Sequence, residues 1–171
     1  MRLKFLIVLL LIAIALGISL SACKKNIRTQ LLKTIVVVED LPVECGVFSA
    51  AKPMFLDPQQ DKAYFEKVLG FWFPESTGKF LADVDLAISN IFSTANQSVA
   101  ITNLAIHYTK EATAQEAESY LSQRYSASNL LFLHRTGSYL AILGVDKSLS
   151  RACVEAYWSV MTERMKKLEN Q

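Results

Sequence analysis

The stretch that decides the fold is VAITNLAIHY, residues 99–108 of the 171-residue chain. Apolar and β-branched residues occupy positions of both parities along it, so both of its sides suit burial. This pattern predicts a central strand of a sheet. The strands and helices that flank it must come from the segments before and after it.

A helix is expected directly after this strand. The residues Thr113-Ala-Gln-Glu116 fit a capping box, in which the threonine hydroxyl accepts from the third helical amide and the glutamate reaches back to the first free one. Apolar residues follow at helical spacing to about Tyr125. The sequence therefore predicts a helix that begins at the capping box and ends near this tyrosine.

Two short apolar runs come next, Leu130–His134 and Tyr139–Leu143. Residues 135–138, RTGS, join them as a hairpin turn, since Gly137 can take the positive φ that such turns require. From Leu149 to Leu168 the apolar residues form the stripe of a long amphipathic helix. The order from residue 99 onward is strand, helix, strand, strand, helix.

This order is most of a ferredoxin-like split unit that lacks its last strand. Upstream, Ile35–Val38 predicts a further strand and Asp61–Leu69 a short helix. Residues 80–92 fit both a helical face and a strand alternation, and we favour a helix because the helical set extends to Phe92. The predicted class is α+β, with an antiparallel sheet of about four strands and helices packed on one face.

The first 23 residues follow a different pattern. Two basic residues precede an uncharged apolar run from Phe5 to about Ile18, and small residues precede Cys23. Basic, apolar and small residues in this order are typical of a secretory signal. The apolar run is short for a bilayer span, which needs about 20 residues, so a plain membrane anchor is the less favoured alternative.

The stretch Leu20-Ser21-Ala22-Cys23 at the end of this run resembles the lipobox of bacterial lipoproteins. The resemblance covers only the first 23 residues. It implies cleavage before Cys23, a diacylglyceryl group on its thiol and an acyl chain, such as palmitate, on the new amine. Two or more chains anchor a protein stably, whereas one holds it only marginally. The alternative is an ordinary secreted protein with an incidental cysteine.

The resemblance implies a domain organisation and a location. Residues 1–22 would be a signal peptide, residues 23–33 the lipidated cysteine with a short basic tether, and residues 34–171 a single α+β domain. The location would be the bacterial cell envelope. Because Lys24, and not Asp, follows Cys23, the outer membrane is favoured in a host that has one.

The charge balance bears on the partners. Without Arg2 and Lys4, the 18 Lys and Arg residues fall to 16, equal to the 16 Asp and Glu residues. A formally neutral mature chain argues against nucleic acid as a partner, because a protein that binds nucleic acid requires a basic surface. The expected partners are the membrane, through acylated Cys23, and an envelope protein or the wall polymer.

Cys45 and Cys153 are the two cysteines outside the signal. An exported protein folds in a compartment that permits disulfides, and the even count favours a pair. A bridge would close a loop of roughly 100 residues, for which the chain-entropy model gives about 4–5 kcal/mol. The alternative is two separate buried thiols.

The sequence predicts no catalytic residue, cofactor or metal site. His107 and His134 fall on predicted strands and could face each other across the sheet, but a metal would need further ligands. A half-buried histidine with a hydrogen-bond partner is the favoured interpretation of each. Cys45 has no adjacent basic residue to activate it, and Asp83 with Asp85 is interpreted as a solvated pair.

Three consecutive aromatic residues, Phe71, Trp72 and Phe73, precede Pro74. Aromatic residues beside a turn often anchor interfaces, so we expect them to contribute to a partner surface. The alternative is that they supply aromatic mass to the core.

These observations together predict a lipid-anchored envelope protein that acts by contact, as a binding or assembly module, without catalysis. One alternative is a small apolar-ligand or lipid carrier in the periplasm, which requires an apolar cavity between sheet and helices. Another is an envelope hydrolase with an unrecognised site, which requires a cleft with convergent polar groups, for instance around the two histidines.

Overall fold

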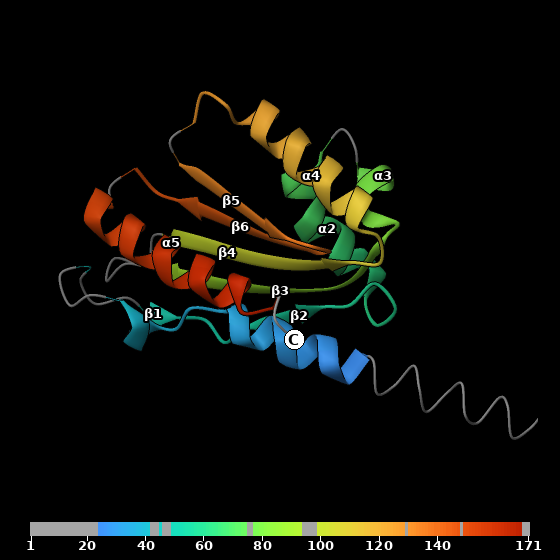
Figure 1. Cartoon of the computed structure of the whole chain (residues 1–171), viewed down its shortest axis with the longest axis horizontal. Helices are drawn as coiled ribbons and strands as arrows, with labels where there is room; N and C mark the ends of the chain where they lie inside the picture. Colours follow the sequence, from blue (N-terminus) through green and yellow to red (C-terminus); the bar gives the residue numbers. More distant parts are fainter. Residues whose placement is uncertain are drawn as a thin grey trace, which may run out of the picture.

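The computed structural model describes residues 24–41, 45, 49–74, 77–93, 99–128, 130–147 and 149–168. Within these ranges, six strands form one antiparallel sheet in the order β1-β3-β4-β6-β5, and β2 pairs with β3 on the same side as β1 (Figure 1). The strands are β1 Ser49–Ala50, β2 Met54–Leu56, β3 Val84–Ser93, β4 Val99–Tyr108, β5 Leu131–Thr136 and β6 Tyr139–Val145. The predicted α+β class is confirmed.

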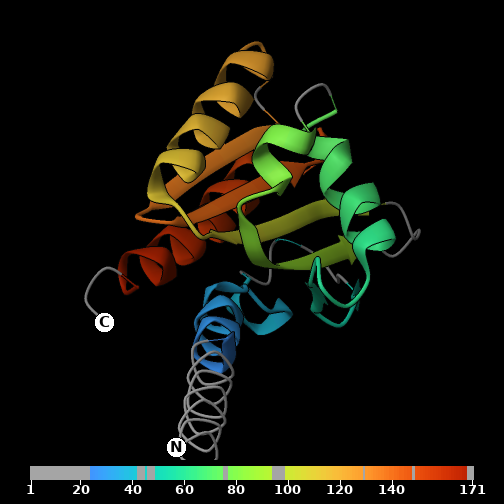
Figure 2. The ribbon, with the colours of Figure 1, turned by 90° about the vertical axis from the view of Figure 1, so that its right-hand side faces the viewer.

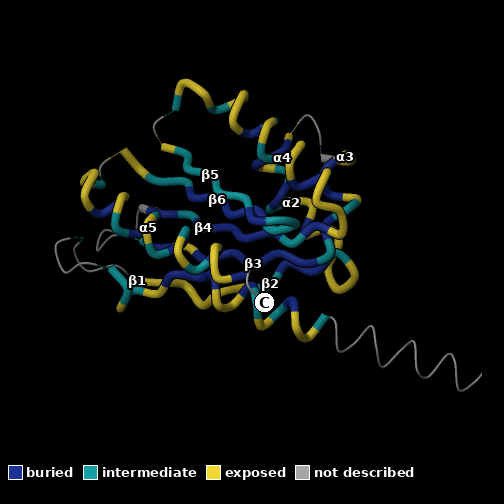
Figure 3. The backbone as a smooth tube through the Cα atoms, viewed as in Figure 1, coloured by how far each residue is buried: buried dark blue, intermediate teal, exposed yellow. Residues whose placement is uncertain are grey.

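Residues 99–108 form the central strand β4, as the sequence predicts. It pairs with β3 on one side and with β6 on the other. Its alternate side chains enter different core clusters, with Leu104 and Ile106 in one and Ile101 and Ala105 in others. Figure 3 shows the consequence, since the middle of the sheet is buried and the outer sides of the helices are exposed.

Helices cover both faces of the sheet (Figure 2). The α4 face is covered by α2 Lys62–Trp72, α3 Thr77–Leu81 and α4 Glu111–Arg124, and the α5 face by α5 Arg151–Lys166 and a helical segment, residues 24–34. The prediction of helices on one face is therefore wrong. The central strands are apolar on both sides, so each side needs a covering layer.

The predicted order of the C-terminal half is confirmed as β4-α4-β5-β6-α5. β6 lies between β4 and β5 in the sheet, and the hairpin turn passes through Gly137, whose φ is 53°. The predicted capping box does not form, because α4 begins at Glu111 and Thr113 lies inside its first turn. The Thr113 hydroxyl instead donates to Oδ2 of Asp83 at 2.7 Å, which ties α4 to the residue before β3.

Residues 80–92 do not form the helix that we favoured. Helix α3 ends at Leu81, and β3 begins at Val84 and runs to Ser93. Leu86 and Ile88 are buried on the α5 face, whereas Ala87 is buried on the α4 face. The strand alternation prevails because β3 has β4 beside it along its whole length.

The helix predicted over Asp61–Leu69 begins one residue later, at Lys62, with Asp61 as its N-cap. The carboxylate of Asp61 accepts from the amide of Tyr64 at 3.0 Å. The helix continues past Gly70 to Trp72, so two of the three consecutive aromatic residues belong to its last turn.

The N-terminal part of the domain differs most from the prediction. Residues 24–34 are helical and do not form a tether, and Ile35–Val38 is not a strand. Ile27 and Leu31, four residues apart, present an apolar stripe that is buried against β3 and β4. Burial of this stripe holds the segment on the sheet. Cys23 itself lies outside the described residues.

Candidate contact surface

The three consecutive aromatic residues divide between surface and core. The Phe71 side chain is 72% exposed, whereas Trp72 is 5% and Phe73 0% exposed. Trp72 and Phe73 belong to the core cluster of the α4 face. Successive residues at a helix end point about 100° apart, so all three could not share one side. The prediction of a three-residue partner surface is wrong for Trp72 and Phe73, and Phe71 alone is available for contact.

A glycine on β6 makes room for the buried neighbour of Phe71. A Cβ atom at Gly144 would lie 2.8 Å from Cη2 of Trp72, so any side chain there would displace the indole. The Phe71 ring packs edge-on against Trp72, with ring centroids 5.4 Å apart. The buried indole of Trp72 therefore fixes the position of the exposed Phe71 ring. No local sequence pattern marks Gly144 for this role, because the contact joins residues that lie far apart along the chain.

Two adjoining grooves lie beside Phe71. The Phe71 groove has a volume of about 290 Å³ and is lined by Phe71, Trp72, Thr102, Tyr125, Ser128, Leu130, Leu131, Gly144, Val145 and Asp146. The α5 groove has a volume of about 510 Å³ and is lined by Ser128, Leu130, Leu131, Phe132, Val145, Asp146, Lys147, Leu149, Arg151, Val154 and Glu155. The two linings share five residues, Ser128, Leu130, Leu131, Val145 and Asp146, so the grooves adjoin at this end of the sheet.

These grooves lie far from the N-terminal helical segment. In Figure 2 the blue segment 24–34 is at the bottom of the molecule, whereas the ends of α2 and α4 are at the top. Phe71 is in the last turn of α2, and Tyr125 and Ser128 directly follow α4. The end of α2, which carries Phe71, and the start of the described chain are therefore at opposite ends of the domain.

Ion pairs reinforce the attachment of segment 24–34. Nζ of Lys24 lies 2.9 Å from Oδ2 of Asp57, and Nη2 of Arg28 lies 3.6 Å from the same oxygen. The Asp57 side chain is only 2% exposed. Burial by itself would raise the pKa of Asp57, but the hydrogen bond from Lys24, helped by the Gln59 amide and the charge of Arg28, brings that pKa below its ordinary value.

The two histidines have separate surroundings. In the register, His107 on β4 faces Tyr139 and His134 on β5 faces Ala141, so β6 lies between the two strands, which are about 10 Å apart. Neither lines the two grooves beside Phe71. Nδ1 of His107 lies 3.4 Å from a carboxylate oxygen of Asp85. Burial lowers the pKa of His107, and the nearby charge of Asp85 opposes this.

The surroundings of both histidines are those of structural residues. The His107 ring packs at a tilt against Tyr139, with ring centroids 4.7 Å apart, and the Tyr139 hydroxyl donates to Gln30 of segment 24–34. His134 packs edge-on against Trp158. Among the residues that the structure describes, no group of three or more His, Cys, Asp or Glu could hold a metal ion.

Asp83 and Asp85 are not a solvated pair, since each has a partner of its own. Asp83 accepts from Nζ of Lys110 at 2.8 Å as well as from Thr113. These two hydrogen bonds, with that from Lys110 the stronger influence, lower the pKa of Asp83. Asp85 lies beside His107. Each carboxylate is therefore held by a partner at the start of β3.

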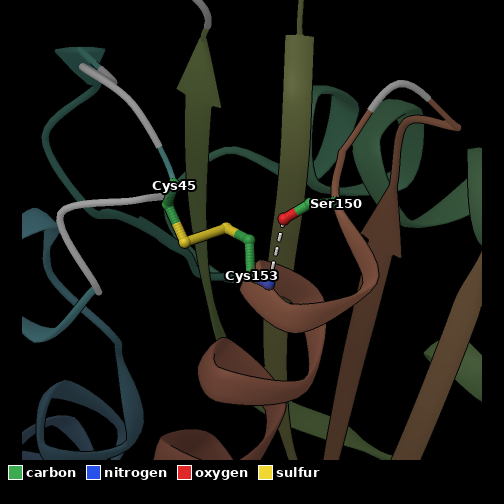
Figure 4. The surroundings of a disulfide bond; sticks show 3 residues. All are labelled: Cys45, Ser150 and Cys153. Carbon is green, nitrogen blue, oxygen red and sulfur yellow. Dashed lines mark hydrogen bonds between the residues drawn. A yellow bond between two sulfur atoms is a disulfide. The ribbon is translucent and has the colours of Figure 1, made fainter.

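Cys45 and Cys153 form the predicted disulfide, with their Cα atoms 5.2 Å apart (Figure 4). Cys153 lies in the first turn of α5, where its amide donates to Oγ of the N-cap Ser150 at 3.3 Å. The bond joins positions 108 apart in the sequence. It fixes the start of α5 to the segment that follows the N-terminal helix.

Within the described ranges, no helix combines the length and apolarity needed to cross a bilayer. No family model matches the chain, and no curated protein or solved structure matches it.

Proposed function

We propose that this chain is a lipid-anchored cell-envelope protein that works as a non-enzymatic binding or assembly module at the membrane surface. The acylated Cys23 would be the anchor, and the outer membrane would be its location in a host that has one. The observation that carries the proposal is the placement of Phe71. Its ring is exposed and lines the Phe71 groove, and α2, which carries it, ends on the side of the domain remote from residue 24.

The anchored end supports this function through its rigidity and charge. Lys24 directly follows Cys23, and the helical segment to which it belongs is packed on the sheet through Ile27 and Leu31. Lys25 on the same segment is exposed, and basic residues near anionic headgroups contribute about 1 kcal/mol each to membrane binding. The domain would therefore sit close to the bilayer with this end toward it.

The opposite end supports contact with a partner in the envelope, either another protein or the wall polymer. An exposed aromatic ring held by a buried neighbour loses little conformational freedom when it binds. Aromatic residues of this kind, placed beside pockets, supply a large share of interface affinity. The Phe71 groove offers the partner a concave, mainly apolar surface, and charged residues such as Lys147 and Arg151 line the adjoining α5 groove.

A photo-crosslinking residue placed at Phe71, in the chain expressed in its own envelope, tests this contact. Tyr64 is the matched control, because it is also an exposed aromatic residue of α2, at 39%, two turns earlier. We expect one discrete partner to be captured at position 71 and not at position 64. Capture at neither position, or equal capture at both, would overturn the contact surface.

The anchor has a separate test. Cys23→Ser removes the thiol that would be acylated and leaves the described domain unchanged. We expect the variant to leave the membrane fraction, and mass analysis of the natural protein to find lipid on Cys23. An unmodified Cys23 thiol in the natural protein would refute the anchor without touching the argument for Phe71.

A lipid or small apolar-ligand carrier is the second candidate, favoured by the α5 groove. Its volume of about 510 Å³ lies within the range of roughly 300–1,000 Å³ of ligand sites. Titration of an apolar fluorescent probe into the chain and into Leu149→Trp, which narrows the groove, distinguishes the two functions. Saturable binding that the substitution abolishes would favour the carrier, and no binding would favour the contact module.

A further inference from the structure

Strand β5 lies at one edge of the sheet and pairs with β6 alone in the described part of the chain. The amide of Val145 donates to the carbonyl of Leu130 at 2.9 Å, which makes this facing pair a hydrogen-bonded one. Hydrogen-bonded and non-hydrogen-bonded pairs alternate along antiparallel strands, so every second residue of β5 directs its N–H and C=O away from β6. These residues are Leu131, Leu133 and Arg135.

No hydrogen bond within the described ranges uses these outward backbone groups. The opposite edge of the sheet consists of shorter strands, because it is formed by β1 and β2, which have two and three residues. Natural sheets protect their edges with short strands, charged side chains, proline, bulges or a covering helix or loop. β5 has six residues in unbroken register and contains no proline, and its one Lys or Arg residue, Arg135, is paired with Glu118 and Glu111 of its own chain. This edge is therefore suited to accept another strand.

We propose that β5 pairs with β5 of a second copy of this chain, about a two-fold axis at Leu133. In this register each Leu133 faces its own copy, and each Leu131 faces Arg135 of the other chain. All the outward backbone groups of one strand then meet those of the other, which is the self-complementarity that a two-fold interface requires. The two sheets would continue as one.

The side chains of this strand suit the same register. On the α5 face, Phe132 of one copy would face His134 of the other. Both residues already contact Trp158 within one chain, with ring centroids at 5.6 and 6.4 Å, so two aromatic clusters would meet across the axis.

The charges of the edge also suit this register. Arg135 would face a leucine, and its guanidinium is already paired with Glu118 and Glu111, each at 3.1 Å. A register centred on Arg135 would instead place two guanidinium groups opposite each other, which is unfavourable. The axis at Leu133 is therefore the preferred one.

The proposed anchor is compatible with this pairing. A two-fold axis between antiparallel strands of one sheet is perpendicular to the sheet, so the α5 faces of both copies lie on the same side. Segment 24–34 packs on that face, and both acylated Cys23 residues could therefore enter one bilayer. This compatibility rests on the proposed function, whereas the pairing of the strands does not depend on it.

Cysteine crosslinking of the full chain in its own envelope tests the pairing. Leu133→Cys should give a covalent dimer under mild oxidation, because facing residues of a hydrogen-bonded pair have Cα atoms about 5.5 Å apart, within disulfide range. Leu131→Cys is the matched control, since four residues of offset place it about 13 Å from its own copy. Peptide mapping should find the two introduced thiols bonded to each other, and Cys45 bonded to Cys153 in the same molecules.

A second measurement avoids any substitution. Sedimentation of the unmodified chain, extracted in mild detergent, should give the mass of two chains. A single-chain mass, or equal crosslinking at positions 131 and 133, would overturn the proposal. Capture of a different protein by the thiol introduced at position 133 would also overturn it and would assign the edge to a partner strand. Dimers that persist in Cys23→Ser would separate this pairing from the anchor, so either can fail alone.

Discussion

The two faces of the sheet are stabilised in different ways. The α4 face is an apolar cluster in which Phe73, Leu121 and Leu140 are completely buried. The α5 face also has an apolar core, but it contains buried polar side chains and is cross-linked by a disulfide. The α4 face is covered by segments close to its strands in sequence, whereas the α5 face is covered by the two ends of the described chain.

The cross-links of the α5 face join these two ends. Besides the disulfide, Nη2 of Arg164 lies 2.7 Å from Oδ1 of Asp40, and the same guanidinium donates to the carbonyl of Ile35. Segments so distant in sequence lose much entropy when they meet, and a covalent bond removes part of that cost from the unfolded chain. The segments of the α4 face need no covalent cross-link, and there burial is supplemented by polar contacts such as those of Thr113 with Asp83 and of Arg135 with Glu118.

The largest expected effect is on the α4 face. Phe73→Ala removes a completely buried ring that contacts Phe80 and Tyr120, and should lower the free energy of unfolding by about 3–5 kcal/mol. Denaturant unfolding measures this loss. Phe71→Ala, on the exposed neighbour, is the control and should cost less than about 1 kcal/mol. Equal losses would mean that the burial of the two rings is not as described.

The disulfide should have the next largest effect, of about 2–4 kcal/mol. Replacing both Cys45 and Cys153 by serine should lower the unfolding free energy by this amount and speed amide exchange in α5 more than in α4. Hydrogen exchange resolved by segment measures the difference. The unmodified chain under reducing conditions should behave like the double variant. Uniform acceleration over both helices would contradict a cross-link that acts on one face.

Asn103 offers a test with the opposite sign. Both polar atoms of its buried side chain lack a well-formed hydrogen bond among the described residues, and it lies beside the Tyr157 hydroxyl, whose pKa is raised mainly by burial. Asn103→Leu, close in volume, should raise the unfolding free energy by about 1–2 kcal/mol, since an unsatisfied amide is removed. Thermal unfolding checks this. A loss of stability would mean that the amide is hydrogen-bonded in solution.

The smallest expected effect is the decrease in the free energy of unfolding that His107, on the α5 face, causes as the pH falls. Burial holds the pKa of His107 below that of the unfolded chain, about 6.5, so the folded state prefers the neutral ring. Its contribution to stability is complete above that pH and is lost as the pH falls through the folded pKa. Unfolding curves from about pH 7.5 to about pH 5 should show a decline that is shallower in His107→Gln. An identical decline in both would assign it to other groups.

The elements predicted correctly from the sequence are those fixed by local chemistry. The turn at Gly137, the apolar stripe of α5 and the two-sided apolar pattern of β4 each specify their own conformation. Residues 80–92 fit two periodicities, and only the pairing of β3 with β4 decides between them. Such pairing between distant segments is absent from any single window of sequence.

The errors have a similar cause. The basic residues around Ile27 and Leu31 suggested a solvated tether, and only the apolar surface of the sheet reveals why these two residues are buried. The aromatic run at residues 71–73 is evident in the sequence, but the division of its rings between surface and core depends on contacts such as that of Trp72 with Gly144, far along the chain. The disulfide was predicted from the expected compartment and the even cysteine count, and the 5.2 Å between the two Cα atoms confirms it over two separate thiols.

The helix at residues 24–34 has a consequence for how a partner would be met. A domain on a flexible leash samples many heights and tilts, so its effective concentration at any one position is low. Here the residue after Cys23 is already part of the packed body. For a chain anchored as proposed, the search for a partner is reduced to diffusion in the plane of the bilayer. Partners would then be selected by their height above the membrane as well as by their chemistry.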